Sequence, residues 1–319
     1  MKLTNTQRNA LTALTLVLSL YYTGCAPQAQ GVIATGNEEV SAEESSQIVG
    51  GRSATLSFQK QNGIVALVIT SQSRNGGSLS ICTGTLIDKR VVLTAAHCLQ
   101  AQPMFKITHI DVYFINNIQK SLDFRSLKNS IPADKMTPHA DFLKDITDEN
   151  VGTAAWNDIA LLRLKTDAPS KFKMAQLPKM TDALKVSPAD TLLLSGFGIA
   201  TPIVNKADID PKTGVEVVVS IEEKSSTSGV LRKISNVAVL PEQNDKEIML
   251  DQSNSQGACH GDSGGPAFLK KANGSLLQVG VTSRGTNSLG NCNEKAIYTS
   301  IPAHLEWIEA TKTALLKAK

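Results

Sequence analysis

A serine in a glycine-rich run is the first candidate for chemistry in this sequence. Ser263 lies within GDSGGP at residues 261–266. A serine hydroxyl is a weak nucleophile unless a base removes its proton and hydrogen-bond donors meet the developing oxyanion. The glycines let the backbone turn tightly and let a substrate approach its N–H groups. Taken alone, the run could also be a glycine-rich turn without a chemical role.

Two further motifs supply the other groups that such a serine needs. His97 lies in TAAHC at residues 94–98, after an apolar run and beside a cysteine that could fix its loop. Asp158 lies in NDIALL at residues 157–162, at the start of an apolar strand, where an unpaired carboxylate would be costly. Taken alone, His97 could be a structural histidine and Asp158 an ordinary aspartate at the start of a strand. The proposed chemistry therefore requires that the fold bring both residues next to Ser263.

Short β-like runs must position these three residues. They are rich in Val, Ile, Leu and Thr and are separated by Gly, Asn, Ser and Pro, at residues 63–70, 83–94, 158–164, 190–198, 215–221 and 277–282. Long helical patterns do not alternate with them, which favours an all-β fold over α/β. One helix is predicted near the end, over residues 303–317, because Pro302 suits a helix start and an apolar face follows.

The order His97, Asp158, Ser263 resembles that of the trypsin/chymotrypsin-like serine peptidase family. The resemblance covers about residues 48–310 and includes IVGG at 48–51, SGFG at 195–198 and YT at 298–299. It implies two packed six-stranded antiparallel β-barrels with a C-terminal α-helix. We place barrel 1 at about 48–175, barrel 2 at about 176–302 and the helix at about 303–317, within a peptidase domain over 48–319.

The resemblance also implies a role for each motif residue. Ser263 would be the nucleophile and His97 the general base and then the general acid. Asp158 would orient the imidazole and stabilise the imidazolium. The backbone N–H groups of Gly261 and Ser263 would form the oxyanion hole. These roles imply a serine endopeptidase that acts on proteins or peptides through an acyl-enzyme, and no metal or cofactor is expected.

Five cysteines leave one without an intramolecular partner. The resemblance pairs Cys82 with Cys98, bracing the histidine loop, and Cys259 with Cys292, joining the nucleophile loop to the pocket wall. The fifth, Cys25, falls before the predicted domain.

Activation and specificity are further implications of the resemblance. Cleavage before Ile48 would free an amine that pairs with Asp262, although Gln47 replaces the basic residue cut by trypsin, so another activating peptidase is needed. The specificity pocket would be formed by Gly257, Gly285 and Ala296, which lack charge and favour small to medium apolar side chains. Arg284 replaces a usual aromatic at the substrate-strand edge.

The amino terminus resembles an export signal. Lys2 and Arg8 precede an apolar stretch at 11–22 that is short for a membrane span. Residues 1–24 are therefore predicted as a signal peptide and 25–47 as a tether or propeptide. The end of the stretch resembles a bacterial lipobox, with Cys25 as the lipidated residue. An ordinary secretory signal with an incidental cysteine is the alternative. The protein is expected to be exported, lipid-anchored in the envelope, secreted after activation, or both.

Composition sets limits on the remaining functions. Hydrophobic residues make up 41%, which supplies a core, and the net charge of +3 gives no case for a nucleic-acid partner.

Two rival functions remain: a non-catalytic binding protein on the same scaffold, and an esterase. The segments 99–155 and 201–228 are longer than such a fold needs, and the sequence assigns them no role.

Overall fold

The computed structural model describes most of the predicted peptidase domain. The described residues are 48–74, 76–100, 104–119, 129–143, 155–201, 206–210, 214, 216–220, 227–241, 244–287 and 290–318. The predicted signal peptide, Cys25 and the tether lie outside the described residues. Among the helices that are described, none is long and apolar enough to cross a membrane.

The first sheet is a closed antiparallel barrel of six strands. Its order is β2-β3-β4-β7-β6-β5. The strands are β2 (Ile64–Ser73), β3 (Gly76–Asp88), β4 (Val91–Thr94), β5 (Lys106–Tyr113), β6 (Ser130–Pro138) and β7 (Ala160–Leu164). All residues of β4 and β7 are buried, so both faces of this part of the barrel wall are covered. The predicted run at 83–94 is thus two strands, because the chain turns at Lys89 and Arg90.

The second sheet has seven strands in the order β1-β11-β8-β13-β14-β15-β12. They are β1 (Arg52–Ser53), β8 (Thr191–Gly196), β11 (Arg232–Ala238), β12 (Glu247–Asp251), β13 (Pro266–Lys270), β14 (Leu276–Gly285) and β15 (Lys295–Ser300). A bridge between Val239 and Leu250 brings the β11 and β12 ends together, which makes the sheet barrel-like. The strand beyond the expected six is β1, which pairs with β11, whereas our predicted boundary groups residues 48–53 with the first barrel.

The long segment 201–228 carries a separate two-stranded ribbon. Strand β9 (Lys206–Ile209) pairs antiparallel with β10 (Glu216–Ser220). The other long segment, 99–155, contributes β5 and β6 to the first barrel. In the part of these segments that the structure describes, β5 and β6 complete the six-stranded barrel, whereas the ribbon β9–β10 lies outside both larger sheets.

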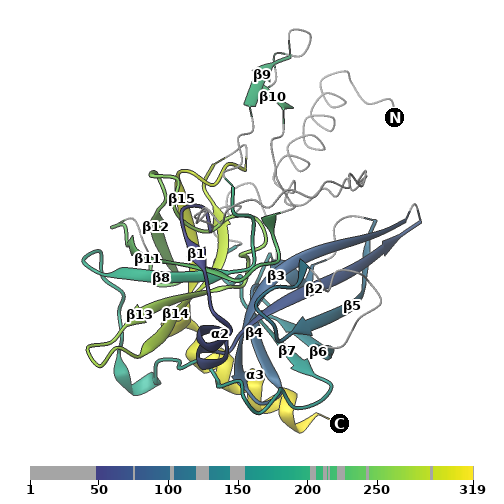
Figure 1. Cartoon of the computed structure of the whole chain (residues 1–319), viewed down its shortest axis with the longest axis vertical. Coiled ribbons are helices and arrows are strands. Elements are labelled where there is room, and N and C mark those ends of the chain that lie inside the picture. The colour runs from purple at the N-terminus through teal and green to yellow at the C-terminus, as the bar shows by residue number, and fades with distance from the viewer. Residues whose placement is uncertain are drawn as a thin grey trace, which may run out of the picture. The chain divides into compact units, whose positions relative to one another are not determined.

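Helices are few in the described part of the chain. The C-terminal helix α3 (Ile301–Lys317) begins two residues before the predicted start and buries Ile301, Leu305, Ile308 and Leu315. These side chains join the first barrel's core, and α3 contacts both β7 and β14 (Figure 1, yellow). A helix not predicted from sequence, α2 (Leu56–Asn62), and two 3-10 turns, η1 (His97–Leu99) and η3 (Met180–Asp182), complete the described helical elements.

Candidate active site

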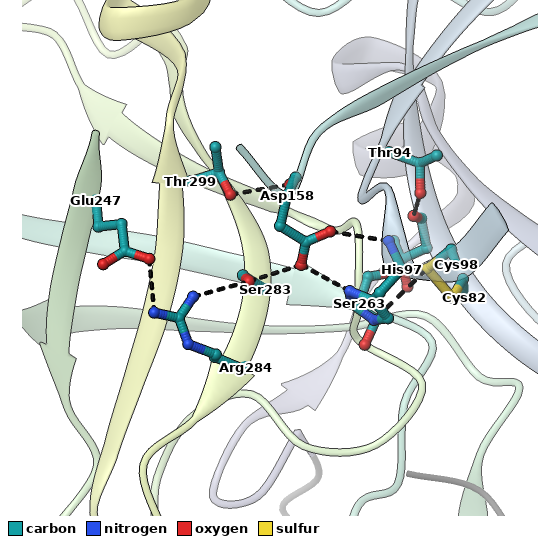
Figure 2. A network of polar contacts seen from close by, with 11 residues as sticks. Cys82, Thr94, His97, Cys98, Asp158, Glu247, Ser263, Ser283, Arg284 and Thr299 are labelled. Atoms are coloured by element: carbon teal, nitrogen blue, oxygen red, sulfur yellow. Dashed lines mark hydrogen bonds and ion pairs between the residues drawn. A yellow bond between two sulfur atoms is a disulfide. The ribbon is translucent and has the colours of Figure 1, made fainter. Parts of the chain in front are cut away.

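His97 is held where a buried strand ends. Strand β4 stops at Thr94, whose hydroxyl donates to the Thr83 carbonyl at 2.9 Å, and the chain then turns into η1. The disulfide Cys82–Cys98 ties η1 to strand β3. The backbone around His97 is therefore held from both sides (Figure 2), and 34% of the His97 side chain is exposed.

Asp158 lies behind His97 and is almost fully buried, with 2% of the residue exposed. Its Oδ2 contacts His97 Nδ1 at 2.7 Å, and its Oδ1 accepts the His97 backbone N–H at 2.9 Å. The Ser283 hydroxyl also donates to Oδ2 at 2.6 Å. The hydroxyl of Thr299 donates to the Asp158 carbonyl at 2.9 Å. The contacts from His97 and Ser283 compensate the carboxylate for its loss of water, as a buried charge requires, while Thr299 holds the backbone.

The electrostatics of this pair suit a base and its anionic partner. Burial lowers the pKa of His97, but the charge and hydrogen bond of Asp158 outweigh it, so the pKa lies above the ordinary 6.5; Arg284 acts in the opposite direction. Burial raises the pKa of Asp158, but His97 and the Ser283 hydrogen bond outweigh it, so the pKa lies below the ordinary 3.8. Asp158 therefore stays ionised while His97 gains and loses a proton.

The loop that carries Ser263 is fixed by contacts with the first barrel. Thr83 on β3 donates its N–H to the Ser263 carbonyl at 2.8 Å and its hydroxyl to the Gly261 carbonyl at 3.0 Å. The same hydroxyl accepts the Phe197 N–H at 3.0 Å. Sequence reasoning missed this role of Thr83, although a threonine next to a disulfide cysteine in an apolar strand is a detectable signal.

Among the residues that the structure describes, some backbone N–H groups of this loop donate a hydrogen bond and others do not. Asp262, Gly264 and Gly265 donate their N–H groups to carbonyls at 2.8–3.0 Å. Within the described part of the chain, the N–H groups of Gly261 and Ser263 donate to no other group. Gly261 has φ +95°, a conformation that favours glycine, and a side chain there would lie 2.9 Å from Gly198 Cα. Two unbonded donors at these positions could stabilise an oxyanion.

Ser263 lies beside the His97 ring in Figure 2. Within the part of the chain that is described, no hydrogen bond joins its Oγ to His97 Nε2, and Nε2 lies 3.9 Å from Cys98 Sγ. Catalytic hydrogen bonds are often long before substrate binds, and a small rotation of the serine changes this distance.

One residue implied in activation, Asp262, belongs to the nucleophile loop itself and directly precedes Ser263. Asp262 is buried, and it accepts the Cys259 N–H at 2.9 Å and the Gly198 N–H at 2.8 Å. Burial raises the pKa of Asp262 to about 6, against the effect of these hydrogen bonds and of Arg232. A side chain on Gly196 or Gly198 would overlap the carboxylate, so glycine is needed there.

Ile48 is also inside the second sheet's core. It is 2% exposed and packs in a cluster with Leu192, Leu194 and Tyr298. The next residue, Val49, pairs with Gly257, whose N–H donates to the Val49 carbonyl at 2.9 Å. The segment at 48–49 thus lies against the chain that leads to Ser263.

Comparison with known proteins identifies this arrangement. A family model described as Trypsin matches residues 48–308. The chain belongs to the trypsin family. Its relatives include serine proteases, and the domain is a serine endopeptidase with the all-β, two-barrel fold and C-terminal helix that we predicted.

The similar proteins are distant in sequence. CLIP domain-containing serine protease B15 of Anopheles gambiae is 26% identical over 252 residues, covering 76% of this chain and 64% of that relative. Fibrinolytic enzyme isozyme C of Lumbricus rubellus is 29% identical over 246 residues, covering 75% and 91%. A solved structure of HL collagenase matches with a TM-score of 0.59 and 19% identity, covering 83% of this chain and 99% of that one. These animal relatives give no support to the bacterial, lipoprotein-like signal predicted at Cys25.

The cysteine pairs of this trypsin-family domain are those implied by the resemblance. Cys82 is bonded to Cys98 and Cys259 to Cys292. The sulfurs of the first pair and His97 form a cluster of metal-type ligands in the described residues. Since both sulfurs belong to the disulfide, neither is a thiolate that could bind a metal.

The predicted pocket residues come from two strands of the second sheet and from the chain between β12 and β13. Gly285 on β14 pairs with Ala296 on β15, and Ala296 is buried while Gly285 is exposed. Gly257 is buried, and a side chain there would meet the Gln252 amide, which bonds both backbone groups of Ala258. The buried glutamine is a feature that sequence reasoning missed.

Proposed function

We propose that Ser263, His97 and Asp158 are the catalytic triad of this trypsin-family endopeptidase. The observation that carries the proposal is the 2.7 Å contact between buried Asp158 and His97, next to a serine loop with two unbonded N–H groups. A buried carboxylate on Nδ1 leaves Nε2 as the free base, on the side that faces the serine.

The proposed reaction has two halves. Ser263 Oγ attacks the peptide carbonyl carbon while His97 Nε2 takes the hydroxyl proton, and Asp158 stabilises the resulting imidazolium. The C–N bond then breaks as His97 returns the proton to the leaving amine. Water attacks the acyl-enzyme with His97 again as base, which releases the acid and restores the Ser263 hydroxyl.

The N–H groups of Gly261 and Ser263 are proposed to bind the oxyanion in both halves. They are unbonded in the described structure while the neighbouring amides are bonded. One such donor contributes about 3 kcal/mol to transition-state stabilisation. The turn at Gly261 is therefore expected to matter as much as any side chain except those of the triad.

The proposed substrates are proteins or peptides with small to medium apolar residues before the scissile bond. The uncharged residues Gly257, Gly285 and Ala296 support this preference, because a cationic side chain would find no partner among them. Cleavage of a peptide library only after Arg or Lys would contradict it.

We propose that an unknown peptidase activates the enzyme by cutting before Ile48. The burial of Ile48 and Asp262 supports this role, because a new amine in that region would compensate the buried carboxylate.

The domain division, the signal peptide, export and lipidation of Cys25 remain parts of the same proposal. Mass spectrometry of the mature amino terminus tests them together: active protein that retains residues before Ile48 would contradict activation, and unmodified Cys25 would contradict the lipid anchor.

Labelling with a fluorophosphonate tests the triad directly. The cut protein should be labelled once, and Ser263→Ala should abolish both labelling and peptide cleavage. The control Ser195→Ala changes a buried serine of the second sheet outside the nucleophile loop and should still be labelled. A correctly cut protein that is never labelled would favour the rival function of a binding protein. Ester cleavage without amide cleavage would favour an esterase.

A further inference from the structure

Arg284 directly follows a residue that contacts the proposed triad. The pairing of β14 with β15 shifts between Thr282 and Arg284, which leaves Ser283 in a bulge. In a regular strand neighbouring side chains point to opposite faces, whereas a bulge re-aims one of them. Here the result is that Arg284 Nη1 donates to Ser283 Oγ at 3.4 Å, while Ser283 Oγ donates to Asp158 at 2.6 Å.

A buried carboxylate fixes the other end of the guanidinium. Arg284 Nη2 lies 2.7 Å from Glu247 Oε1, across β15 on strand β12, and the Glu247 side chain is 7% exposed. Asn244 orients Glu247: its Nδ2 donates to Oε2 at 3.2 Å, and its Oδ1 accepts the Glu247 N–H at 2.9 Å. Holding a carboxylate out of water is costly, so the pair is a built feature of this site.

The contacts form a continuous line from Glu247 through Arg284 and Ser283 to Asp158 and His97 (Figure 2). Arg284 keeps 32% of its side chain exposed, nearly the same as His97. Its positive charge opposes the charge that His97 acquires, and it lowers the pKa of His97 against the effect of Asp158.

The other charged groups near the triad are arranged differently. Lys246 Nζ and His304 Nε2 both contact Asn157 Oδ1, behind Asp158, at 3.2 and 3.1 Å. Asp262 bonds the amides of Gly198 and Cys259 instead of the triad. Among the described cations, Arg284 is the one whose charge bears on the pKa of His97.

We infer that Arg284, held by Glu247, is a positioning residue of this peptidase: it supports Ser283 against Asp158 and opposes protonation of His97, which extends activity to lower pH. The inference rests on the proposed triad. The uncharged aromatic that Arg284 replaces, according to the family resemblance, would lack this effect.

The test is the pH profile of kcat/KM for the cut enzyme and four variants. In Arg284→Gln the acid limb should move up by about half a pH unit, which is roughly a threefold loss on the acid side. In Glu247→Gln the charge of the Arg284 guanidinium is no longer neutralised, so the acid limb of the profile should move to lower pH. Arg284→Lys keeps the charge and should keep the wild-type limb.

Arg90→Gln is the matched control. Arg90 is 35% exposed, so it resembles Arg284 in exposure, but it donates to the Leu164 and Lys165 carbonyls in the first barrel. Its loss should not move the limb. Equal shifts in Arg284→Gln and Glu247→Gln, or none beyond that of Arg90→Gln, would overturn the inference while leaving the triad intact. Full activity of Ser263→Ala would instead refute the triad, and the inference with it.

Discussion

At the scale of single residues, Ser283 shows how much of the site depends on groups outside the triad. Its hydroxyl supplies Asp158 with a short hydrogen bond and accepts one from Arg284. A carboxylate that is 2% exposed needs such donors, because it has lost its water. Ser283 is therefore expected to affect catalysis although it does not touch a substrate's reacting atoms.

The substitution Ser283→Ala should lower kcat by about tenfold, which corresponds to one hydrogen bond to a charged group. KM should change little, because the loss weakens stabilisation of the imidazolium in the transition state. Steady-state kinetics of the cut enzyme measure both constants.

Ser195→Ala is the control for this prediction. Ser195 is buried in the same sheet and donates to the Arg232 carbonyl at 2.6 Å, the same distance as the Ser283 bond. Its removal should cost stability and leave kcat near the wild-type value. If the two variants lose kcat equally, the effect of Ser283 is structural and our account of it is wrong.

The motif residues could be predicted from sequence, but their support could not. His97, Asp158 and Ser263 are each marked by a local run, and the structure brings the regions that carry them together. The sequence around Thr83, Gln252 and Glu247 does not show which groups they bind, and for Thr83 and Glu247 only the fold brings those groups near. A buried polar residue in an apolar strand is the general signal, but it does not name its partner.

At the scale of elements, the presence of strands was predicted better than the boundaries of strands and better than the helices. Helix α2 was missed although its sequence carries both ends: the Thr55 hydroxyl accepts the Phe58 N–H at 3.1 Å, and Gly63 ends the helix with φ +65°. The seven residues between them are too few for a clear periodic pattern. The early start of α3 has a different cause: Pro302 lies in the first turn of the helix and does not precede it, and Ile301 shares the helical spacing of Leu305 and Ile308.

Helix α3 is expected to be bound to the barrel through its buried face. Ile308 is completely buried in the core cluster, so Ile308→Ala should lower the free energy of unfolding by about 3 kcal/mol. On the same helix, Leu316 is 44% exposed, and Leu316→Ala should change it by less than about 0.5 kcal/mol. Urea denaturation of both variants measures the difference; similar values would mean that α3 is not packed as described.

At the scale of the whole molecule, Ser263, proposed for catalysis, and Asp262, proposed for activation, lie in one loop that contacts both sheets. Thr83 of the first barrel bonds the Ser263 loop, and the same loop carries Asp262, which bonds Gly198 of the second. A change at Asp262 can therefore reach the oxyanion donors through a few residues of chain. Because this loop contacts both sheets, we expect the ionisation of Asp262 to affect the stability of the entire domain.

As far as Asp262 is concerned, the uncut protein should become more stable as the pH falls from about 6 to 3.8. Its pKa is raised from 3.8 to about 6 in the folded state, so the folded protein holds a proton that the unfolded chain releases. The stabilisation is complete below pH 3.8 and is lost as the pH rises through about 6. The difference between the pKa values of 3.8 and about 6 corresponds to roughly 3 kcal/mol of unfolding free energy.

Replacing the carboxyl by an amide separates this effect from other titrations. In the uncut protein, Asp262→Asn should remove that part of the pH dependence and be more stable than wild type at pH 7.5, as measured by urea denaturation from pH 4.5 to 7.5. After cleavage before Ile48 the order should reverse, because the new amine stabilises the Asp262 carboxylate, and the variant should lose activity. A cut Asp262→Asn protein with full activity and unchanged stability would rule out this coupling between Ile48 and the nucleophile loop.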